Sequence, residues 1–410
     1  MRTDLLAGER APNRLSPWRF VLVFGVVSML ADFVYEGARS IVGPYLATFG
    51  ASAAVVGVVT GAGEAAALLF RFVTGPLSDR TRRYWPITIA GYVITVAAVP
   101  LLAAVATLWQ AAVAVVAERF GKAVRTPARD TMLGHASAGL GRGRAFAVHE
   151  ALDQSGALLG PLVVAGMIAL SGFRLGFAVL AIPGALAVAL LGHLRRAVPT
   201  PAAYDPVGSD AVAAARAGTP EPWWRFSRRF WAYSAFTALT MLGFATFGVL
   251  AYHLAVARVL PAWQIPIVYA AAMGVDALAA LASGWCYDRI GLRGLLALPA
   301  LTAVVPFLAF SDRPVLAWIG ALVWGAAVGV HESTMRAAVT DLVPAARRGT
   351  GYGTFTAAYG LAWLGGSAII GALYDTSLAG LHVFVLATQA AALVAFVPMA
   401  LGRTGAASPP

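Results

Sequence analysis

Charged residues stand inside several long apolar segments of the chain, where a charge is costly. In residues 19–46, Asp32, Glu36 and Arg39 follow at spacings of four and three, which place them on one face of a helix. A charge at the centre of a bilayer costs about 2.5–3.5 kcal/mol even on lenient insertion scales, so such groups must pair or line a wet cavity. Residues of this kind are candidates for proton coupling or substrate binding. They are Asp32, Glu36, Arg39, Glu64, Arg119, Asp153, Asp276 and Glu332.

Asp32 is the most isolated of these residues. It is flanked by Ala31 and Phe33, has no basic residue within one turn, and lies roughly 20 Å along a helix from Arg19. Desolvation disfavours the charged form of a carboxylate, so a buried carboxylate takes up a proton more readily than an exposed one. Asp32 is therefore predicted to act either as a proton carrier or as the counter-charge of a cationic substrate.

A structural role is the alternative at several of the charged positions. Glu118 and Lys122 are four residues apart, as are Glu332 and Arg336, and each pair is expected to meet on a helix surface. His149 stands close to a loop, where a structural role is the simpler interpretation.

The composition is that of a protein buried in a membrane. Apolar residues make up 59% of the 410 residues and charged residues 12%, and the mean hydropathy is +0.75. A soluble protein carries about twice that share of charge. The net charge of +11 does not indicate nucleic acid, because the arginines stand in short gaps between apolar segments. The single Cys286 allows no internal disulfide, and a metal site around His253 is only a minor alternative.

The sequence lacks the motifs of ATP-driven pumps and of common enzymes. No phosphate loop of the Gly-x-x-x-x-Gly-Lys-Ser/Thr kind occurs, and His331-Glu332 lacks the second histidine of a zinc-protease helix. No serine nucleophile motif stands out. We therefore expect no enzymatic activity, no cofactor and no resident metal. A membrane-embedded enzyme or a sensor is a remote alternative.

The apolar segments predict twelve transmembrane helices, since a spanning helix needs roughly 20 apolar residues. They are placed at 19–46, 52–77, 85–104, 107–126, 143–170, 174–194, 229–257, 264–287, 293–311, 314–336, 348–374 and 380–402. The first six form a bundle within residues 1–194 and the last six within 229–410, joined by a proline-containing cytoplasmic linker at 195–228. The predicted fold is an all-α membrane protein with two pseudo-symmetric six-helix bundles.

Arginines are concentrated in the loops on one side of these predicted helices. The opposite loops carry only Arg174, Arg258 and Arg313. Because cytoplasmic loops are enriched in arginine, both termini are predicted to be cytoplasmic, in an inner-membrane protein. The arginines of the predicted cytoplasmic side are Arg80, Arg82, Arg83, Arg125, Arg129, Arg142, Arg144, Arg195, Arg196, Arg225, Arg228, Arg229, Arg289, Arg293, Arg347 and Arg348.

A loop signature occurs twice, about half a chain apart. Residues 75–80 are Gly-Pro-Leu-Ser-Asp-Arg and residues 284–289 are Gly-Trp-Cys-Tyr-Asp-Arg, an offset of 284 − 75 = 209 residues. Each copy closes a long apolar segment and opens a short arginine-rich one. The repeat indicates two related halves, which is the usual construction of secondary transporters.

These features together resemble the major facilitator superfamily along essentially the whole chain. The shared pattern is two sets of six helices, a central loop, and Gly-x-Leu-Ser-Asp-Arg-x-x-Arg at 75–83. The stretch 119–130, with Gly143-Arg-Ala-Phe, is similar to an uncharacterised prokaryotic branch of that superfamily. The chain departs from the family pattern at Arg82, where glycine is usual, whereas the second copy keeps the glycine as Gly291.

The resemblance implies that both loop copies form a conformational latch on the cytoplasmic side. Asp79 is then expected near the start of the eleventh helix and Asp288 near the start of the fifth, because a helix N-terminus stabilises a carboxylate. Topology anchoring is the alternative role of the arginines. The implied latch residues are Gly75, Asp79, Arg80, Arg83, Gly284, Asp288 and Arg289.

A second resemblance concerns Gly156, Gly160 and Pro161, which are similar to a glycine–proline motif of antiporters in that superfamily. Val164 and Ala165 stand where two further glycines are usual, and close helix packing is the alternative role. The expected function is alternating-access transport by proton-coupled efflux of a drug-like molecule or metabolite. The alternative is metal-ion or metabolite transport by uniport or symport. The expected partners are a small-molecule substrate, protons and the lipid bilayer, with no nucleic acid, and the chain is expected to be a monomer.

Overall fold

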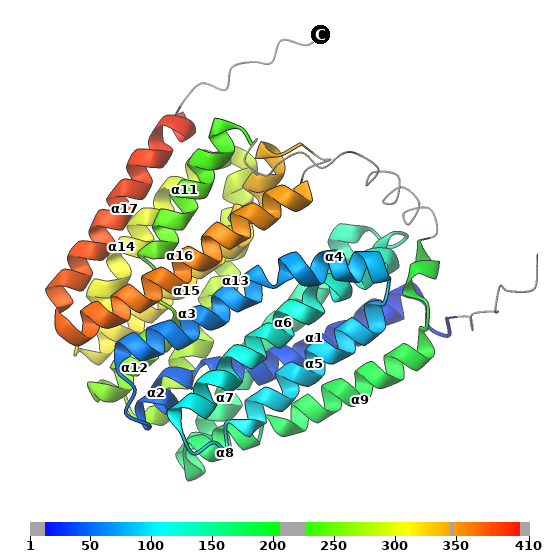
Figure 1. Cartoon of the computed structure of the whole chain (residues 1–410), viewed down its shortest axis with the longest axis horizontal. Coiled ribbons are helices and arrows are strands. Elements are labelled where there is room, and N and C mark those ends of the chain that lie inside the picture. Colours follow the sequence, from blue (N-terminus) through cyan, green and yellow to red (C-terminus); the bar gives the residue numbers. More distant parts are fainter. Residues whose placement is uncertain (1–12, 206–225, 345–347, 402–410) are drawn as a thin grey trace, which may run out of the picture.

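The computed structural model describes residues 13–205, 226–344 and 348–401, and every regular element within these ranges is a helix (Figure 1). The elements of the first half are α1 Pro17–Arg39, α2 Val42–Ala47, α3 Ala53–Leu69, α4 Arg71–Thr81, α5 Tyr84–Leu101, α6 Leu108–Ser137, α7 Arg142–Ser171, α8 Phe173–Ala178, α9 Ala181–Ala197 and the 3₁₀ turn η1 Pro201–Tyr204. Those of the second half are α11 Arg228–Leu242, α12 Phe247–Val256, η2 Ala262–Gln264, α13 Ile265–Ile290, η3 Gly291–Leu296, α14 Ala297–Ala309, α15 Pro314–Leu342, α16 Arg348–Thr376 and α17 Leu378–Leu401.

Ten stretches of the described residues are long and apolar enough to cross a membrane. One of them, Ala262–Ala309, contains both α13 and α14. Helix α6 is not among the ten, although it has 30 residues, because charged residues recur along its second half. The chain is thus all helical over the described residues, with ten candidate spans. Four of the predicted helices are divided in the structure: 19–46 into α1 and α2, 52–77 into α3 and α4, 174–194 into α8 and α9, and 229–257 into α11 and α12.

Helix α6 extends well beyond the predicted end at residue 126 and continues to Ser137. Arg125 and Arg129 thus lie inside a helix, and the prediction that they anchor a cytoplasmic loop is wrong. Arg125 is only 1% exposed. Arg125 faces Asp32 of α1, and Arg129 pairs with Asp153 of α7 and with Asp130 of its own helix, so both charges are compensated inside the protein.

Hydroxyl side chains fix several helix starts. The Ser16 side chain accepts a hydrogen bond from the Arg19 amide at the start of α1, and Ser52 caps α3 in the same way. At the start of α6, Thr107 and Gln110 form a reciprocal capping box. These caps satisfy amides that have no partner within the helix.

The backbone has a positive φ at the residue three positions after the aspartate of each loop copy, in the left-handed helical region at Arg82 (ψ 20°) and outside it at Gly291 (ψ −142°). Arg82 has φ 52° and Gly291 has φ 59°, each directly after its helix. Only glycine adopts positive φ without a steric penalty, so the backbone geometry accounts for the glycine that the second copy keeps. Arg82 takes the same φ with a side chain and carries the strain of that conformation.

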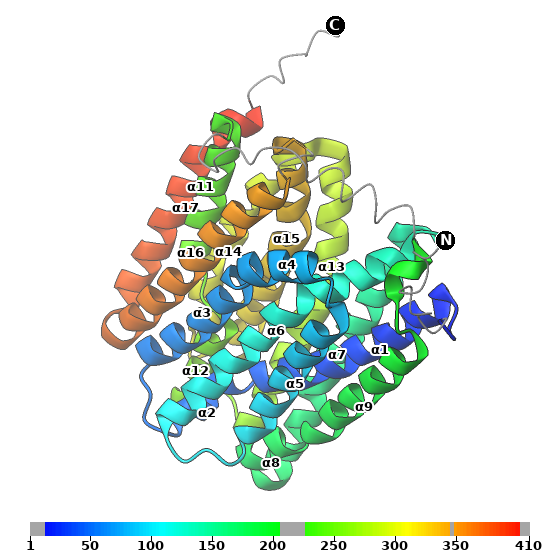
Figure 2. The same ribbon diagram turned by 45° about the vertical axis from the view of Figure 1, so that its right-hand side comes forward.

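The two halves lie side by side as two groups of helices that diverge in direction (Figures 1 and 2). We name the two ends of the molecule by their loops. The arginine-rich end has the loops at 82–83 and 138–141, and the arginine-poor end has the loops at 102–107 and 310–313. The halves come together at the arginine-poor end, where α2 and α12 meet, and separate towards the other end.

Helices α3 and α16 form a continuous seam between the halves. A methyl group on Gly57 would collide with the Ser367 carbonyl oxygen, and one on Gly371 would collide with the carbonyl oxygen of Ala53. Small residues thus allow the two backbones to touch, as in other membrane helix pairs. The Thr60 and Thr246 hydroxyls add a 2.6 Å hydrogen bond between the halves.

Asp375 joins the halves at the arginine-poor end of the seam. Its Oδ1 accepts a 3.0 Å hydrogen bond from the Ala53 amide, and its Oδ2 accepts a 2.9 Å bond from the Ala54 amide. A carboxylate near the end of α16 therefore caps the N-terminus of α3, where the helix dipole favours negative charge.

Candidate functional site

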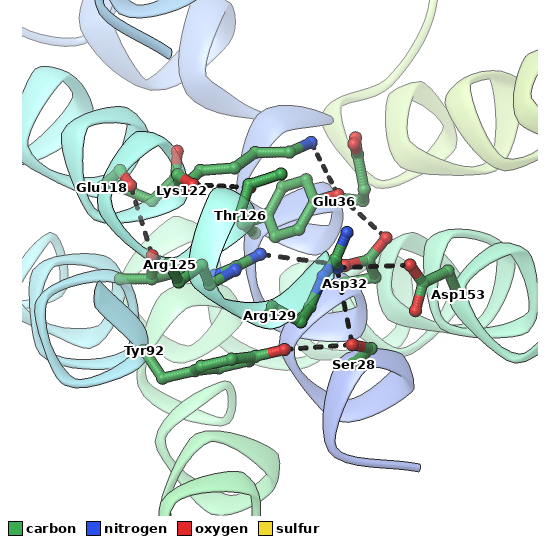
Figure 3. A network of polar contacts seen from close by, with 12 residues as sticks. Ser28, Asp32, Glu36, Tyr92, Glu118, Lys122, Arg125, Thr126, Arg129 and Asp153 are labelled. Atoms are coloured by element: carbon green, nitrogen blue, oxygen red, sulfur yellow. Dashed lines mark hydrogen bonds and ion pairs between the residues drawn. The ribbon is translucent and has the colours of Figure 1, made fainter. Parts of the chain in front are cut away.

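The charged residues of the first half converge between α1, α6 and α7 (Figure 3), and Glu64 of α3 joins them through Arg39 and Arg119. Helix α1 contributes three of them from one face, as the spacing predicts, and α6 contributes the largest number. The members of this charged cluster are Asp32, Glu36, Arg39, Glu64, Glu118, Arg119, Lys122, Arg125, Arg129 and Asp153. Five are acidic and five are basic, so the cluster is electrically balanced when all ten are ionised.

The part of the cluster nearest the arginine-poor end is tightly paired. Glu64 meets Arg39 at 2.8 Å and Arg119 at 3.4 Å. Arg119 also meets Glu118 at 3.2 Å, and Arg39 meets Glu36 at 3.5 Å. The expected Glu118–Lys122 pair is replaced by the Glu118–Arg119 pair. Three carboxylates here share two arginines, and each carboxylate has an arginine within 3.5 Å, which lowers the cost of burying it.

Asp32 is held more loosely than those carboxylates. Its Oδ2 accepts a 2.8 Å hydrogen bond from the Tyr35 hydroxyl, which itself accepts a 2.8 Å bond from Lys122. The nearest guanidinium, that of Arg125, is 3.9 Å from its Oδ1. Asp32 is 8% exposed. It is therefore a buried carboxylate whose close neighbour is a neutral hydroxyl and whose cationic partner is distant.

Arg129 connects Asp32's helix to α7. Its Nε donates a 2.9 Å hydrogen bond to the neighbouring Asp130. Its Nη1 lies 3.6 Å from Asp153 and 3.5 Å from the Ser28 hydroxyl, which also bonds Tyr92 at 3.0 Å (Figure 3). His149 lies 3.7 Å from Asp153. The predicted candidate Asp153 thus sits beside the same group of arginines as Asp32.

Lys122, Arg125 and Arg129 were not assigned to the site from the sequence. Arg125 donates a 3.0 Å hydrogen bond to Thr95 and lies over the Tyr92 ring at 4.6 Å. A signal for these residues was present, since positions 122, 125 and 129 continue the helical face of Arg119 at spacings of three and four. Because the helix was predicted to end at residue 126, this continuous face was not recognised.

The second half contributes fewer charges, and its buried acid has no ion pair in the described part of the chain. Asp276 on α13 is 4% exposed, and its Oδ1 has no hydrogen-bond partner there. Glu332 on α15 is exposed, and the predicted Glu332–Arg336 pair falls on an arginine side chain outside the described residues. Across the halves, the Tyr269 hydroxyl on α13 donates a short hydrogen bond to Glu36.

A cavity of about 450 Å³, including space continuous with solvent, opens beside the paired charges. The polar residues that line it are Tyr35, Arg39, Thr60, Glu64, Glu118 and Arg119 from the first half and Thr246 from the second. Valine and leucine side chains form much of the remaining wall. The cavity therefore joins apolar surface to a few converging polar groups, which is the usual make-up of a small-molecule site.

The predicted latch residues lie at the arginine-rich end. Gly75 and Asp79 are half-buried on α4, whereas Arg80 and Arg83 are exposed. In the second copy Gly284 is half-buried, Asp288 is exposed, and exposed Arg289 lies over the Trp285 ring at 3.7 Å. The expected contact of Asp79 at the start of α16 falls at residues outside the described part of the chain. The contact of Asp288 with the start of α7 remains a prediction.

The antiporter-like motif on α7 lies against α1. A methyl group on Gly156 would collide with the Met29 carbonyl oxygen, and one on Gly160 would collide with that of Phe33. Pro161 is buried next to them. These glycines bring the α7 backbone onto α1 beside Asp32, so close packing accounts for the small residues whatever else the motif does.

Within the described residues, no three His, Cys, Asp or Glu side chains come together in a way that could hold a metal ion. His253 bonds the Tyr374 hydroxyl at 2.8 Å and the Ser311 carbonyl at 3.3 Å. Its ring nitrogens therefore have partners within the second half.

Comparison with known proteins places this arrangement in a family. The family model of the Major Facilitator Superfamily matches residues 24–367. The chain belongs to the major facilitator superfamily. As a member, it is a multi-pass membrane transporter rather than an enzyme.

Its relatives and structural neighbours agree with that family. Uncharacterized proteins of Mycobacterium bovis and Mycobacterium tuberculosis are 54% identical over 391 residues, which cover 95% of this chain and 95% of theirs. The nucleoside transporter NupG has a TM-score of 0.68 at 18% identity and covers 93% of this chain and 98% of its own. The peptide transporter POT has a TM-score of 0.70 at 16% identity, with coverage of 93% and 95%. A bacterial homologue of the human lysosomal transporter Spinster, in an inward-facing and occupied conformation, has a TM-score of 0.68 at 16% identity, with coverage of 94% and 96%. At these identities the neighbours establish the superfamily fold and leave the substrate open.

Proposed function

We propose that this protein is a proton-coupled secondary transporter that exports a small drug-like molecule or metabolite by alternating access. It would cross the cell (inner) membrane twelve times in two six-helix bundles, at 1–194 and 229–410, with the linker 195–228 and both termini cytoplasmic. The arginine distribution supports this orientation, because the arginine-rich end is then the cytoplasmic one. The protein would act as a monomer, with a site between its two halves.

The observation that carries the proton coupling is the environment of Asp32. A buried ion needs close compensation, and Asp32 has one neutral hydroxyl at 2.8 Å and one guanidinium at 3.9 Å. Glu64, by comparison, has two arginines at 2.8 and 3.4 Å. Neutralising Asp32 with a proton therefore breaks fewer close contacts than neutralising Glu64. Asp153 is the second candidate, because it shares the group of arginines beside Asp32.

Coupling follows if the protonation of Asp32 changes how α1 meets its neighbours. Tyr35 joins Asp32 to Lys122, and Glu36, one turn along α1, receives the Tyr269 hydroxyl from the second half. A proton on Asp32 weakens its attraction for Arg125 and Lys122 while leaving the tighter pairs in place. Protonation of Asp32 therefore takes place one helical turn away from a contact between the two halves.

Export is supported by the antiporter-like motif Gly156, Gly160 and Pro161, which borders Asp32 through α1. Symport or uniport of a metabolite is the second candidate, because the cavity beside Arg39 and Glu64 has polar groups of both signs. Both candidates use the same fold: export by antiport moves protons against the substrate, symport moves them with it, and uniport moves none.

The test is flux into liposomes that contain the purified protein and an internal pH dye. Cationic drugs, neutral metabolites and divalent metals are added in turn, with wild type compared with Asp32→Asn. We expect substrate-dependent proton movement that is lost in Asp32→Asn and retained in Glu150→Gln, an exposed acid on α7. Transport with no proton movement in the wild type would identify a uniporter, and equal proton movement in Asp32→Asn would remove Asp32 from the mechanism.

A further inference from the structure

Lys122 uses only some of its hydrogen-bond donors on the side chains that the structure describes. It is the sole lysine of the chain and the fifteenth of the 30 residues of α6, so it lies near the middle of that helix. Its ammonium donates one 2.8 Å hydrogen bond to the Tyr35 hydroxyl and lies 4.2 Å from the centre of that ring. It forms no ion pair with any side chain that the structure describes. Since an ammonium group has three N–H donors, two are left for a ligand.

Among the residues that the structure describes, the second half has two acids that form no ion pair. Glu332 is the nineteenth of the 29 residues of α15 and forms neither an ion pair nor a hydrogen bond with the side chains described in the structure. Asp276 on α13 is buried with an unpartnered Oδ1. Glu332 lies within electrostatic range of both Lys122 and Asp276. Among the described residues, Glu332 is therefore an acid without an ion pair that lies near Lys122 and near a second such acid, Asp276.

Aromatic rings lie next to these charges and supply apolar surface. His331, adjacent to Glu332, contacts Phe244 and Tyr359, and Tyr359 contacts Trp363. Arg39 of the first half lies 6.0 Å from the centre of the Trp363 ring. The aromatic group therefore reaches the boundary between the halves at the level of the charged cluster. A ligand there would meet rings along its body and charges at its ends.

We propose that Lys122 and Glu332 bind the two ends of a zwitterionic substrate with an apolar body, such as an apolar amino acid or short peptide. Lys122 receives the carboxylate, with the Tyr35 hydroxyl beside it, and Glu332 receives the ammonium group, with Asp276 adding negative charge on that side. The proposal rests on the transport function above and names the substrate class of that site. Because one residue comes from each half, the substrate is held fully only while both halves face it.

This arrangement predicts a specific order of affinities. A zwitterion satisfies both unpaired charges, whereas a ligand with one charge leaves a cation or an acid without a partner. A hydrogen bond to a charged group is worth roughly 10- to 100-fold in affinity, and we expect that advantage over each singly charged analogue. In Lys122→Gln the zwitterion should lose its advantage over the cationic analogue. In Glu332→Gln it should lose its advantage over the anionic one.

The experiment measures binding to full-length protein in lipid nanodiscs by thermal shift and calorimetry. The probes are two matched triplets: phenylalanine with N-acetylphenylalanine and phenylalanine amide, and alanyl-phenylalanine with its N-acetyl and amide forms. Lys122→Arg keeps the positive charge and should retain the preference for the carboxylate, which guards against a folding defect in Lys122→Gln. Size-exclusion profiles verify that every variant is folded.

Each outcome decides the proposal. Tighter binding of the zwitterion in at least one triplet, lost in the two directions stated, supports it. No preference for the zwitterion in either triplet, or a preference unchanged in Lys122→Gln and Glu332→Gln, overturns it. The liposome assay reports separately on proton coupling. Zwitterion binding without proton movement would refute the coupling alone, and proton movement driven by another substrate class would refute the zwitterion site alone.

Discussion

Removal of the Asp375 side chain should favour the conformation that is open at the arginine-poor end. Asp375 is exposed, and its two oxygens accept bonds of 3.0 and 2.9 Å from the Ala53 and Ala54 amides of the other half. A carboxylate cap at a helix N-terminus is worth about 0.5–2 kcal/mol, and exposure together with the remaining Ser52 cap places this contact near 1 kcal/mol. The contact is lost when that end opens. Asp375→Ala should therefore raise the ratio of the open to the closed arginine-poor end about fivefold.

The population shift is measurable by double electron–electron resonance in nanodiscs. Cys286 is first replaced by serine, and spin labels are placed on cysteines introduced at the exposed positions Ala104 and Arg313, in arginine-poor loops of the two halves. We expect the long-distance population to grow in Asp375→Ala and to grow less in Asp375→Asn, which keeps one acceptor.

The matched control is Ser377→Ala. The Ser377 hydroxyl caps α17 through the Gly380 amide at 3.0 Å, so this variant loses a cap at the same end but within one half. Its distance distribution should match the wild type. An unchanged distribution in folded Asp375→Ala, or the same shift in both variants, would refute the interpretation that Asp375 links the halves.

Three further predictions follow from the backbone, the seam and the topology. Arg82→Gly should raise the free energy of unfolding by about 0.5 kcal/mol, because glycine adopts φ 52° without strain, whereas Gly291→Ala should lower it. Thermal unfolding in detergent measures both effects. A lower melting temperature for Arg82→Gly would contradict the argument. Gly57→Leu should separate α3 from α16 and abolish transport. Gly75→Leu should still fold, because an added Cβ there meets nothing within 4 Å. Equal yields and equal flux for the two variants would contradict the role of α3 and α16 as a close contact between the halves. A reporter fused after Pro410 should be active in the cytoplasm, and a periplasmic signal would reverse the proposed orientation.

The helices and the family were predictable from the sequence because both depend on local signals. Apolar length marks the spans, and the duplicated motif at 75–80 and 284–289 marks the halves. The positive φ after each copy also left a local signal, in the glycine retained as Gly291. These features need no knowledge of which helices touch.

The pairing within the site was not predictable in the same way, because it depends on contacts between distant helices. Spacing suggested that Glu118 would meet Lys122, but Arg119 takes the carboxylate and Lys122 turns to Tyr35 on α1. The burial of Arg125 was missed for a similar reason, since arginine near an apolar boundary is typical of a loop anchor. Only the proximity of α1 identifies it as a counter-charge to Asp32.

The charge content of α6 has a consequence for how the protein is made. A helix with so many ionised side chains partitions poorly into lipid by itself, and its partners Asp32, Glu36 and Glu64 belong to segments that leave the ribosome earlier. Stable insertion of α6 therefore requires that α1 and α3 remain at the translocation site until α6 has been synthesised. Simultaneous substitution of all three acids would therefore be expected to lower the yield of inserted protein, whereas Asp32→Asn leaves the pairing of Glu64 with Arg39 and Arg119 in place.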